Sequence, residues 1–145
     1  MLRTFYFARK YGTERTKDIL MLSDRKTLYS RYGHTVENKR TWAVITGGTN
    51  GLGYKIAKLL AKQGFNICIL GRNQEKIDVC IQKIKFKTND NRLKIKSLLV
   101  DFSEMATIED YKIKVGKKLI DLDIGIVVLS AGCLNEGPFA DITAK

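Results

Sequence analysis

The chain has 145 residues, of which 44% are hydrophobic and only one is proline. This length supports one globular domain with a hydrophobic core, and the composition excludes a disordered or low-complexity protein. The net charge is +11. Residues 1–40 include 10 basic and 4 acidic side chains, and residues 41–100 include 11 basic and 3 acidic ones. This bias suits phosphate-bearing ligands, an acidic protein partner or an anionic membrane surface. Nucleic acid is disfavoured, because no element interleaves basic and aromatic residues.

Residues 1–40 are expected to form a basic, partly helical N-terminal extension. The first twelve residues, MLRTFYFARKYG, are compatible with a basic amphipathic helix of the kind found in mitochondrial import presequences. SDRKTLYSRY predicts a second helix, capped by Ser23 and ended by Gly33. A polar linker then leads to Trp42. No apolar run reaches the length of about 18 residues that a membrane-spanning helix needs, so none is predicted.

The stretch Trp42 to Gly53, WAVITGGTNGLG, predicts a strand (Trp42–Ile45), a glycine loop and the start of a helix. Gly47 is expected to turn the chain, Gly51 to let a pyrophosphate approach the backbone, and Gly53 to let the helix pack closely on the strand. The helix start offers amides and a positive dipole to an anion. A glycine-rich loop that binds no ligand remains the alternative.

The remaining elements alternate between strand and helix, which predicts a parallel sheet. The expected helices are Leu52–Gln63, a helix capped by Asn73, and one that opens at Ser103; the expected strands are Phe65–Leu70, Arg92–Val100 and Ile124–Leu129. Their apolar spacing predicts these inward-facing side chains: Leu52, Ile56, Leu59 and Leu60; Ile77, Cys80, Ile81 and Ile84; Ile108, Tyr111, Val115 and Leu119.

The cysteines Cys68, Cys80 and Cys133 have no paired spacing and are interpreted as buried thiols of a reducing compartment. A metal site is not expected, because the single histidine, His34, has no cysteine or carboxylate at ligand spacing.

The TGxxxGxG spacing, together with VDFS (Val100 to Ser103) and LDIGIVVLSAG (Leu122 to Gly132), resembles the short-chain dehydrogenase/reductase family. The similarity is greatest to its branch of 3-ketoacyl-CoA reductases and 17β-hydroxysteroid dehydrogenases, and runs from about Trp42 to the last residue. It implies a Rossmann-type doubly wound α/β sheet, truncated after about the fourth strand. Residues 41–145 would then be a truncated NADP-binding domain that follows the 1–40 extension.

The cofactor expected from this resemblance is NADP(H). Arg72 follows the second strand, where NAD-binding domains place an acidic residue, and its guanidinium suits a 2′-phosphate. Asp101 would bond the adenine or act only as a cap, and Ala131 and Gly132 would let the cofactor ribose approach. The family motif NNAG is changed here, with Leu129 and Ser130 in place of its two asparagines. The full expected set is Thr46, Gly47, Thr49, Asn50, Gly51, Leu52, Gly53, Arg72, Asp101, Ala131 and Gly132.

No catalytic residue is assigned. In the family a serine and a YxxxK pair follow the fourth strand by several tens of residues, and no such pair follows Ile124–Leu129 within 1–145. Tyr6 with Lys10 and Tyr54 with Lys58 match YxxxK but are interpreted as chance. The chain is therefore expected to be a non-catalytic accessory subunit. The alternative is the nucleotide-binding half of an NADPH-dependent ketoacyl-CoA or hydroxysteroid reductase, completed by a second chain or by further C-terminal sequence.

The strand Ile124–Leu129 is almost wholly apolar and would be interior in a complete dehydrogenase sheet. Here it is expected to be an edge, which predicts another protein chain packed on it and on Cys133 to Phe139, within a multi-subunit complex. The basic start favours a mitochondrial location, with the endoplasmic reticulum or cytoplasm as alternatives.

Overall fold

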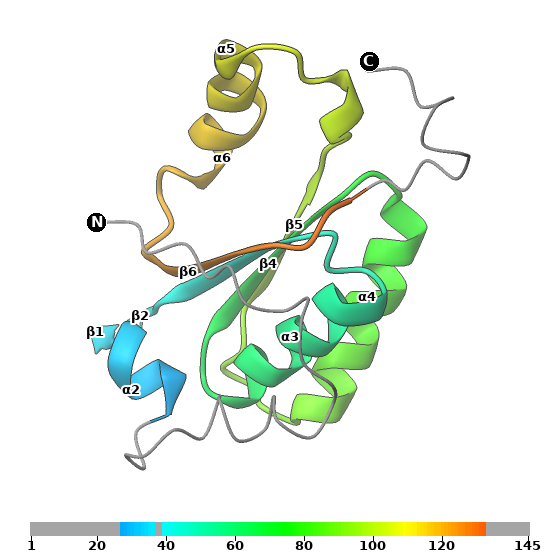
Figure 1. Cartoon of the computed structure of the whole chain (residues 1–145). Helices are drawn as coiled ribbons and strands as arrows, with labels where there is room; N and C mark the ends of the chain where they lie inside the picture. Colours follow the sequence, from blue (N-terminus) through cyan, green and yellow to red (C-terminus); the bar gives the residue numbers. More distant parts are fainter. Residues whose placement is uncertain (1–26, 37–38, 133–145) are drawn as a thin grey trace, which may run out of the picture.

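The computed structural model describes residues 27–36 and 39–132. Its centre is a sheet of β3 (Trp42–Thr46), β4 (Asn66–Gly71), β5 (Ile95–Leu99) and β6 (Ile124–Leu129), in the spatial order β5-β4-β3-β6. Every neighbouring pair in it is parallel. Because parallel neighbours need a crossover, helices lie on both sides of the sheet (Figure 1). The predicted Rossmann-type α/β fold is confirmed.

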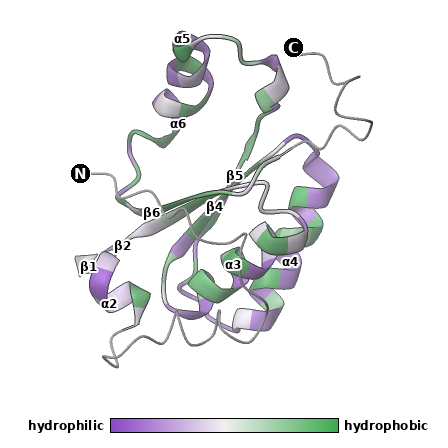
Figure 2. Cartoon of the chain, in the orientation of Figure 1, coloured by the Kyte–Doolittle hydropathy of each residue, from purple (hydrophilic) through white to green (hydrophobic). Residues whose placement is uncertain are grey.

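One face of the sheet packs against α3 (Gly51–Lys62) and α4 (Gln74–Thr88). Figure 2 shows the central strands as mainly hydrophobic, while both helices alternate between hydrophobic and hydrophilic residues. The buried core on this side consists of Ala43, Ile45, Ala57, Leu60, Ala61, Phe65, Ile67, Ile69, Ile77, Cys80, Ile84 and Leu93. The inward face predicted for α4 is confirmed, with Ile81 only partly buried.

The inward face predicted for α3 is wrong at Leu52, whose side chain is 51% exposed. The buried stripe is made of small residues instead, Gly53, Ala57 and Ala61, together with Leu60. Since α3 begins at Gly51, Leu52 belongs to the first turn, beside the loop rather than over the sheet. The small side chains let the helix lie close to β3 and β4.

The elements on the other face of the sheet are η1 (Phe102–Glu104), α5 (Ile108–Tyr111), η2 (Lys112–Gly116) and α6 (Lys117–Leu119), which leave part of it exposed. The single helix predicted from Ser103 is wrong. Thr107 and Asp110 form a capping box that starts a new helix at Ile108.

The predicted inward positions on this segment are only half correct. Val115 and Leu119 pack against the cluster around Val44 and Leu70, but Ile108 is 77% and Tyr111 45% exposed. The π-helical turn η2 inserts an extra residue per turn. It therefore rotates the earlier residues out of register with the later ones.

The described part of the N-terminal extension contributes to the core. Helix α2 (Leu28–Tyr32) ends at Gly33, as predicted. Its N-terminal cap is Thr27, whereas the predicted cap, Ser23, lies outside the described residues. The Tyr29 ring packs edge-on against Phe65 with 4.8 Å between ring centroids. The linker, predicted only to be polar, contains a short antiparallel pair, β1 (Thr35–Val36) and β2 (Lys39–Arg40).

Strand β6 is an edge of the described sheet, as predicted. Its two faces differ. Ile126 and Val128 pack towards α3 and the N-terminal segment, whereas Val127 is 37% and Leu129 74% exposed on the opposite face. Within the described residues, then, the apolar β6 is paired on one side and covered on only one face.

Candidate dinucleotide-binding edge

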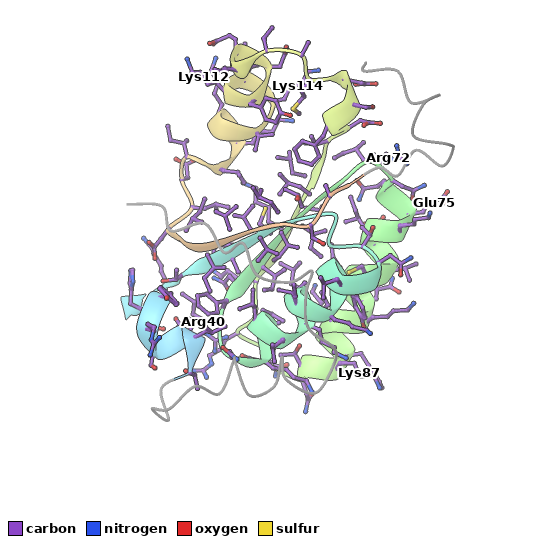
Figure 3. The ribbon with its side chains drawn as sticks, in the orientation of Figure 1. Arg40, Arg72, Glu75, Lys87, Lys112 and Lys114 are labelled. Carbon is purple, nitrogen blue, oxygen red and sulfur yellow. The ribbon has the colours of Figure 1, made fainter. Side chains whose placement is uncertain are left out.

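The carboxyl ends of all four parallel strands meet at one edge of the sheet. The segments that leave this edge are the glycine loop after β3, Arg72 after β4, Asp101 after β5, and Ser130 to Gly132 after β6. Figure 3 shows Arg72 at this edge and Arg40 at the opposite one. The structure thus brings the predicted cofactor-binding residues to one side, where open α/β sheets bind ligands.

The glycine loop is built so tightly that two of its positions exclude a side chain. Gly47 has φ +64°, and a Cβ there would lie 2.9 Å from the N and Cα atoms of Ala131. A Cβ on Gly53 would collide with the carbonyl oxygen of Gly47. The turn and the close packing predicted for these two glycines are confirmed.

The start of α3 faces open space. Gly51 has φ +54°, and a Cβ built on it would meet nothing within 4 Å. Asn50 caps the helix, with its Oδ1 accepting a bond from the Gly51 amide at 2.8 Å. A twelve-residue helix with an accessible N-terminal turn provides amides and a positive dipole for an anion. The residues therefore fit a pyrophosphate group.

Thr46 has a structural role that the sequence did not reveal. Its hydroxyl oxygen accepts hydrogen bonds from the amides of Ser130 and Ala131, each at 3.0 Å. Through these bonds the buried Thr46 ties the end of β3 to the end of β6. These two bonds anchor the strand ends despite the change of the two asparagines. A direct contact between Thr46 and the cofactor stays a prediction.

Arg72 and Asp101 lie on neighbouring strand ends. Arg72 is exposed, so its guanidinium is accessible to a ligand. Asp101 caps η1, because its Oδ1 accepts bonds from the Ser103 hydroxyl at 2.7 Å and the Ser103 amide at 3.0 Å. These bonds, with a smaller contribution from the positive charge of Arg72, hold the pKa of Asp101 below its usual value. The cap interpretation is confirmed, and the adenine contact stays a prediction.

The two YxxxK matches do not gain support. Tyr54 packs against the core with Lys58 Nζ 5.8 Å from its ring centroid, and Tyr6 lies outside the described residues.

The single histidine is paired with a carboxylate, since His34 Nε2 lies 2.9 Å from Asp123 Oδ2. Within 27–36 and 39–132 there is no group of three His, Cys, Asp or Glu residues that could hold a metal ion. None of the described helices has the length and apolar character needed to cross a bilayer.

Cys80 is a second residue whose contact the sequence did not reveal. Cys68 and Cys80 are both buried, as predicted, and Cys133 lies outside the described residues. Burial raises the pKa of each thiol to about 11. The Cys80 thiol donates to the carbonyl oxygen of Gly48 in the glycine loop, with 3.3 Å between sulfur and oxygen.

A sequence model described as short chain dehydrogenase matches residues 41–145, which is more than half of the chain. The chain belongs to the short-chain dehydrogenase family. This family member is 38% identical over 94 residues to very-long-chain 3-oxoacyl-CoA reductase of Podospora anserina, covering 65% of the chain and 26% of that protein. It is 39% identical over 93 residues to 17-beta-hydroxysteroid dehydrogenase type 3 of Danio rerio, covering 64% of the chain and 28% of that protein.

Solved short-chain dehydrogenases share the fold. The bulky-bulky ketone specific alcohol dehydrogenase from Comamonas testosteroni superposes with a TM-score of 0.59 at 25% identity, over 72% of this chain and 39% of that one. The short-chain dehydrogenase from Sphingobium yanoikuyae, solved with NADPH, superposes with a TM-score of 0.58 at 23% identity, over 72% of this chain and 39% of that one. This family member spans less than a third of the curated relatives' length in these alignments.

Proposed function

We propose that this chain is the NADP(H)-binding half of a ketone reductase of the ketoacyl-CoA or hydroxysteroid type. The observation that carries the proposal is the glycine loop, in which Gly47 and Gly53 permit no side chain while Gly51 opens the start of α3. A dinucleotide bound there would supply the hydride of the reaction. The names of the most similar relatives, which include 3-oxoacyl-CoA reductases and a 17-beta-hydroxysteroid dehydrogenase, support this substrate class.

The choice of NADP(H) over NAD(H) rests on Arg72. Its exposed guanidinium stands at the end of β4, beside the glycine loop, where Thr49 Cγ2 would lie 3.4 Å from a Cβ on Gly71. A planar guanidinium forms charge-assisted, bidentate bonds to a phosphate. A hydrogen bond to a charged group contributes about 1.5–3 kcal/mol, or about one to two decades in affinity.

Calorimetric titration with NADPH and NADH tests this choice. We expect tighter binding of NADPH, and loss of that preference in Arg72→Asp. Lys87→Asp is the matched control, because it changes the charge equally at an exposed position at the far end of α4 (Figure 3). Equal affinities of the unmodified chain for the two nucleotides would refute the assignment of Arg72.

The catalytic acid of the proposed reductase is expected to come from polypeptide other than the described residues. We propose that this polypeptide is the remainder of the dehydrogenase fold, which extends the sheet from β6. Two observations support it: among the described strands β6 is an apolar edge with Leu129 74% exposed, and the relatives contain two thirds or more of their length outside the match. An exposed apolar edge strand is an aggregation site unless another segment pairs with it or covers it.

Light scattering tests the edge. Residues 1–145 alone are expected to self-associate, and a stable, soluble monomer with a cooperative melt would contradict the proposed partner on β6. An assay of NADPH oxidation with 3-ketoacyl-CoA then distinguishes the two functions considered from the sequence. The assembled protein turns over if it is a reductase, whereas an accessory subunit binds NADPH in the assembly without reducing any ketone.

A further inference from the structure

The Gly48 carbonyl is a polar group in an apolar environment. Gly48 is buried, and a Cβ on it would lie 3.2 Å from Ile69 and 3.3 Å from Ile45. A buried carbonyl without a hydrogen-bond partner is costly, so such groups are nearly always paired. The Cys80 thiol, itself 2% exposed, provides this partner from the inner face of α4.

The direction of this carbonyl fixes the direction of the next amide. The described backbone has no cis peptide bonds. In a trans peptide the C=O of one residue and the N–H of the next point in opposite directions. Because the Gly48 oxygen points inward to Cys80, the Thr49 amide hydrogen points away from the core. This direction, away from the Cys80 side of the loop, is the one that an anion-binding amide of the loop needs.

We propose that Cys80 is a positioning residue for the dinucleotide, which holds the Gly48–Thr49 peptide in the orientation that presents the Thr49 amide to the phosphates. This inference rests on the proposed function, since it concerns the same loop. Without the thiol, the Gly48 carbonyl lacks its partner, and this peptide is freed to rotate towards solvent. Such a rotation turns the Thr49 amide away from the ligand, and the missing side chain of Gly48, whose ψ angle changes in the rotation, lowers its steric cost.

Cys68 provides a matched control. It is also fully buried and its pKa is raised to about 11, but it lies in β4 and packs with Val44 and Leu70 on the opposite face of the sheet. Cys68→Ala and Cys80→Ala therefore remove the same atom from a buried site. Only Cys80→Ala removes a contact to the loop. Cys80→Ser keeps a donor at the position.

The experiment compares these variants by hydrogen exchange with mass spectrometry and by NADPH titration, all in the full chain. Loop peptides report on the bonds from Gly47 N to Leu70 O and from Gly51 N to Asn50 Oδ1. Cys80→Ala is expected to raise exchange in the loop and to weaken NADPH binding, each by roughly two- to five-fold, as for loss of one weak hydrogen bond. Cys68→Ala should leave both unchanged even if it melts earlier, and Cys80→Ser should restore slow exchange.

Equal loop exchange in Cys80→Ala and Cys68→Ala would overturn the proposal. If the unmodified chain binds no NADPH while Cys80→Ala still raises loop exchange, the thiol positions the loop and the proposed function fails instead. If NADPH binds and Cys80→Ala changes neither exchange nor affinity, the proposed function stands and the role of Cys80 is refuted.

Discussion

Substitution of Gly53 by alanine is expected to destabilise the protein, although alanine is the better helix former. The added Cβ would collide with the Gly47 carbonyl oxygen and lie 3.0 Å from its carbonyl carbon and 3.1 Å from Ser130 Oγ. Two of these atoms are backbone and cannot move aside by a change of rotamer. Overpacking costs about 1–3 kcal/mol, and this backbone clash places Gly53→Ala near the upper limit. The higher helix propensity of alanine than of glycine offsets about 1 kcal/mol of this cost.

The net expectation for Gly53→Ala is a loss of about 2 kcal/mol, measured by urea unfolding followed by circular dichroism. Gly116→Ala is the matched control, because the nearest atom to its Cβ would be Tyr111 O at 3.8 Å and its φ is helical. It is expected to be neutral or to stabilise by up to about 1 kcal/mol. If Gly53→Ala is as stable as the unmodified chain, the close packing of α3 on the glycine loop is wrong.

Three further predictions concern buried and paired groups. Thr46→Val leaves the Ser130 and Ala131 amides without their acceptor and should cost about 1–3 kcal/mol in urea unfolding, whereas Thr46→Ser should recover most of it. The hydrogen bond from Arg40 lowers the pKa of Asp90 in the folded protein. The bond therefore contributes to the free energy of unfolding above the unfolded pKa near 4, and this contribution is lost as the pH falls through the folded pKa. In an acid titration of stability, Asp90→Asn should lack this loss. Burial raises the pKa of Cys68 and of Cys80 from 9.0 in the unfolded chain to about 11 in the folded protein. The free energy of unfolding should therefore fall as the pH rises from about 9 to about 11. A flat profile between pH 9 and 11 that is unchanged in Cys68→Ala would contradict the burial of these thiols.

The sequence predicted those parts of the fold that are determined locally. The loop between β3 and α3 was predictable because Gly47 and Gly53 occupy positions where only glycine fits. Helix α4 was predictable because a strong cap, Asn73, precedes an uninterrupted apolar period. The gathering of Arg72 and Asp101 at one edge followed from the parallel sheet alone.

The missed features depend on competition or on distant contacts. The capping box at Thr107 competes with the start predicted at Ser103, and sequence spacing alone did not rank the two. Leu52 has the apolar character of a core residue, but it lies in the first turn of α3 and is 51% exposed. The bonds from Cys80 to Gly48 and from Ser130 to Thr46 join residues 32 and 84 positions apart, so no local pattern indicates them.

The order of the strands also has a consequence for folding. The hydrogen bond from Lys94 to Asn66, next to the pairing of β4 with β5, closes a chain segment of 28 residues. The bond from Ser130 to Thr46, at the end of the pairing of β3 with β6, closes one of 84. Loop closure of the longer segment costs about 1 kcal/mol more in entropy, since the cost grows with the logarithm of length. Non-local pairings of this kind form late. We therefore expect β3, β4 and β5 to assemble first, and β6 to dock last onto a flank of β3 that stays open throughout that interval.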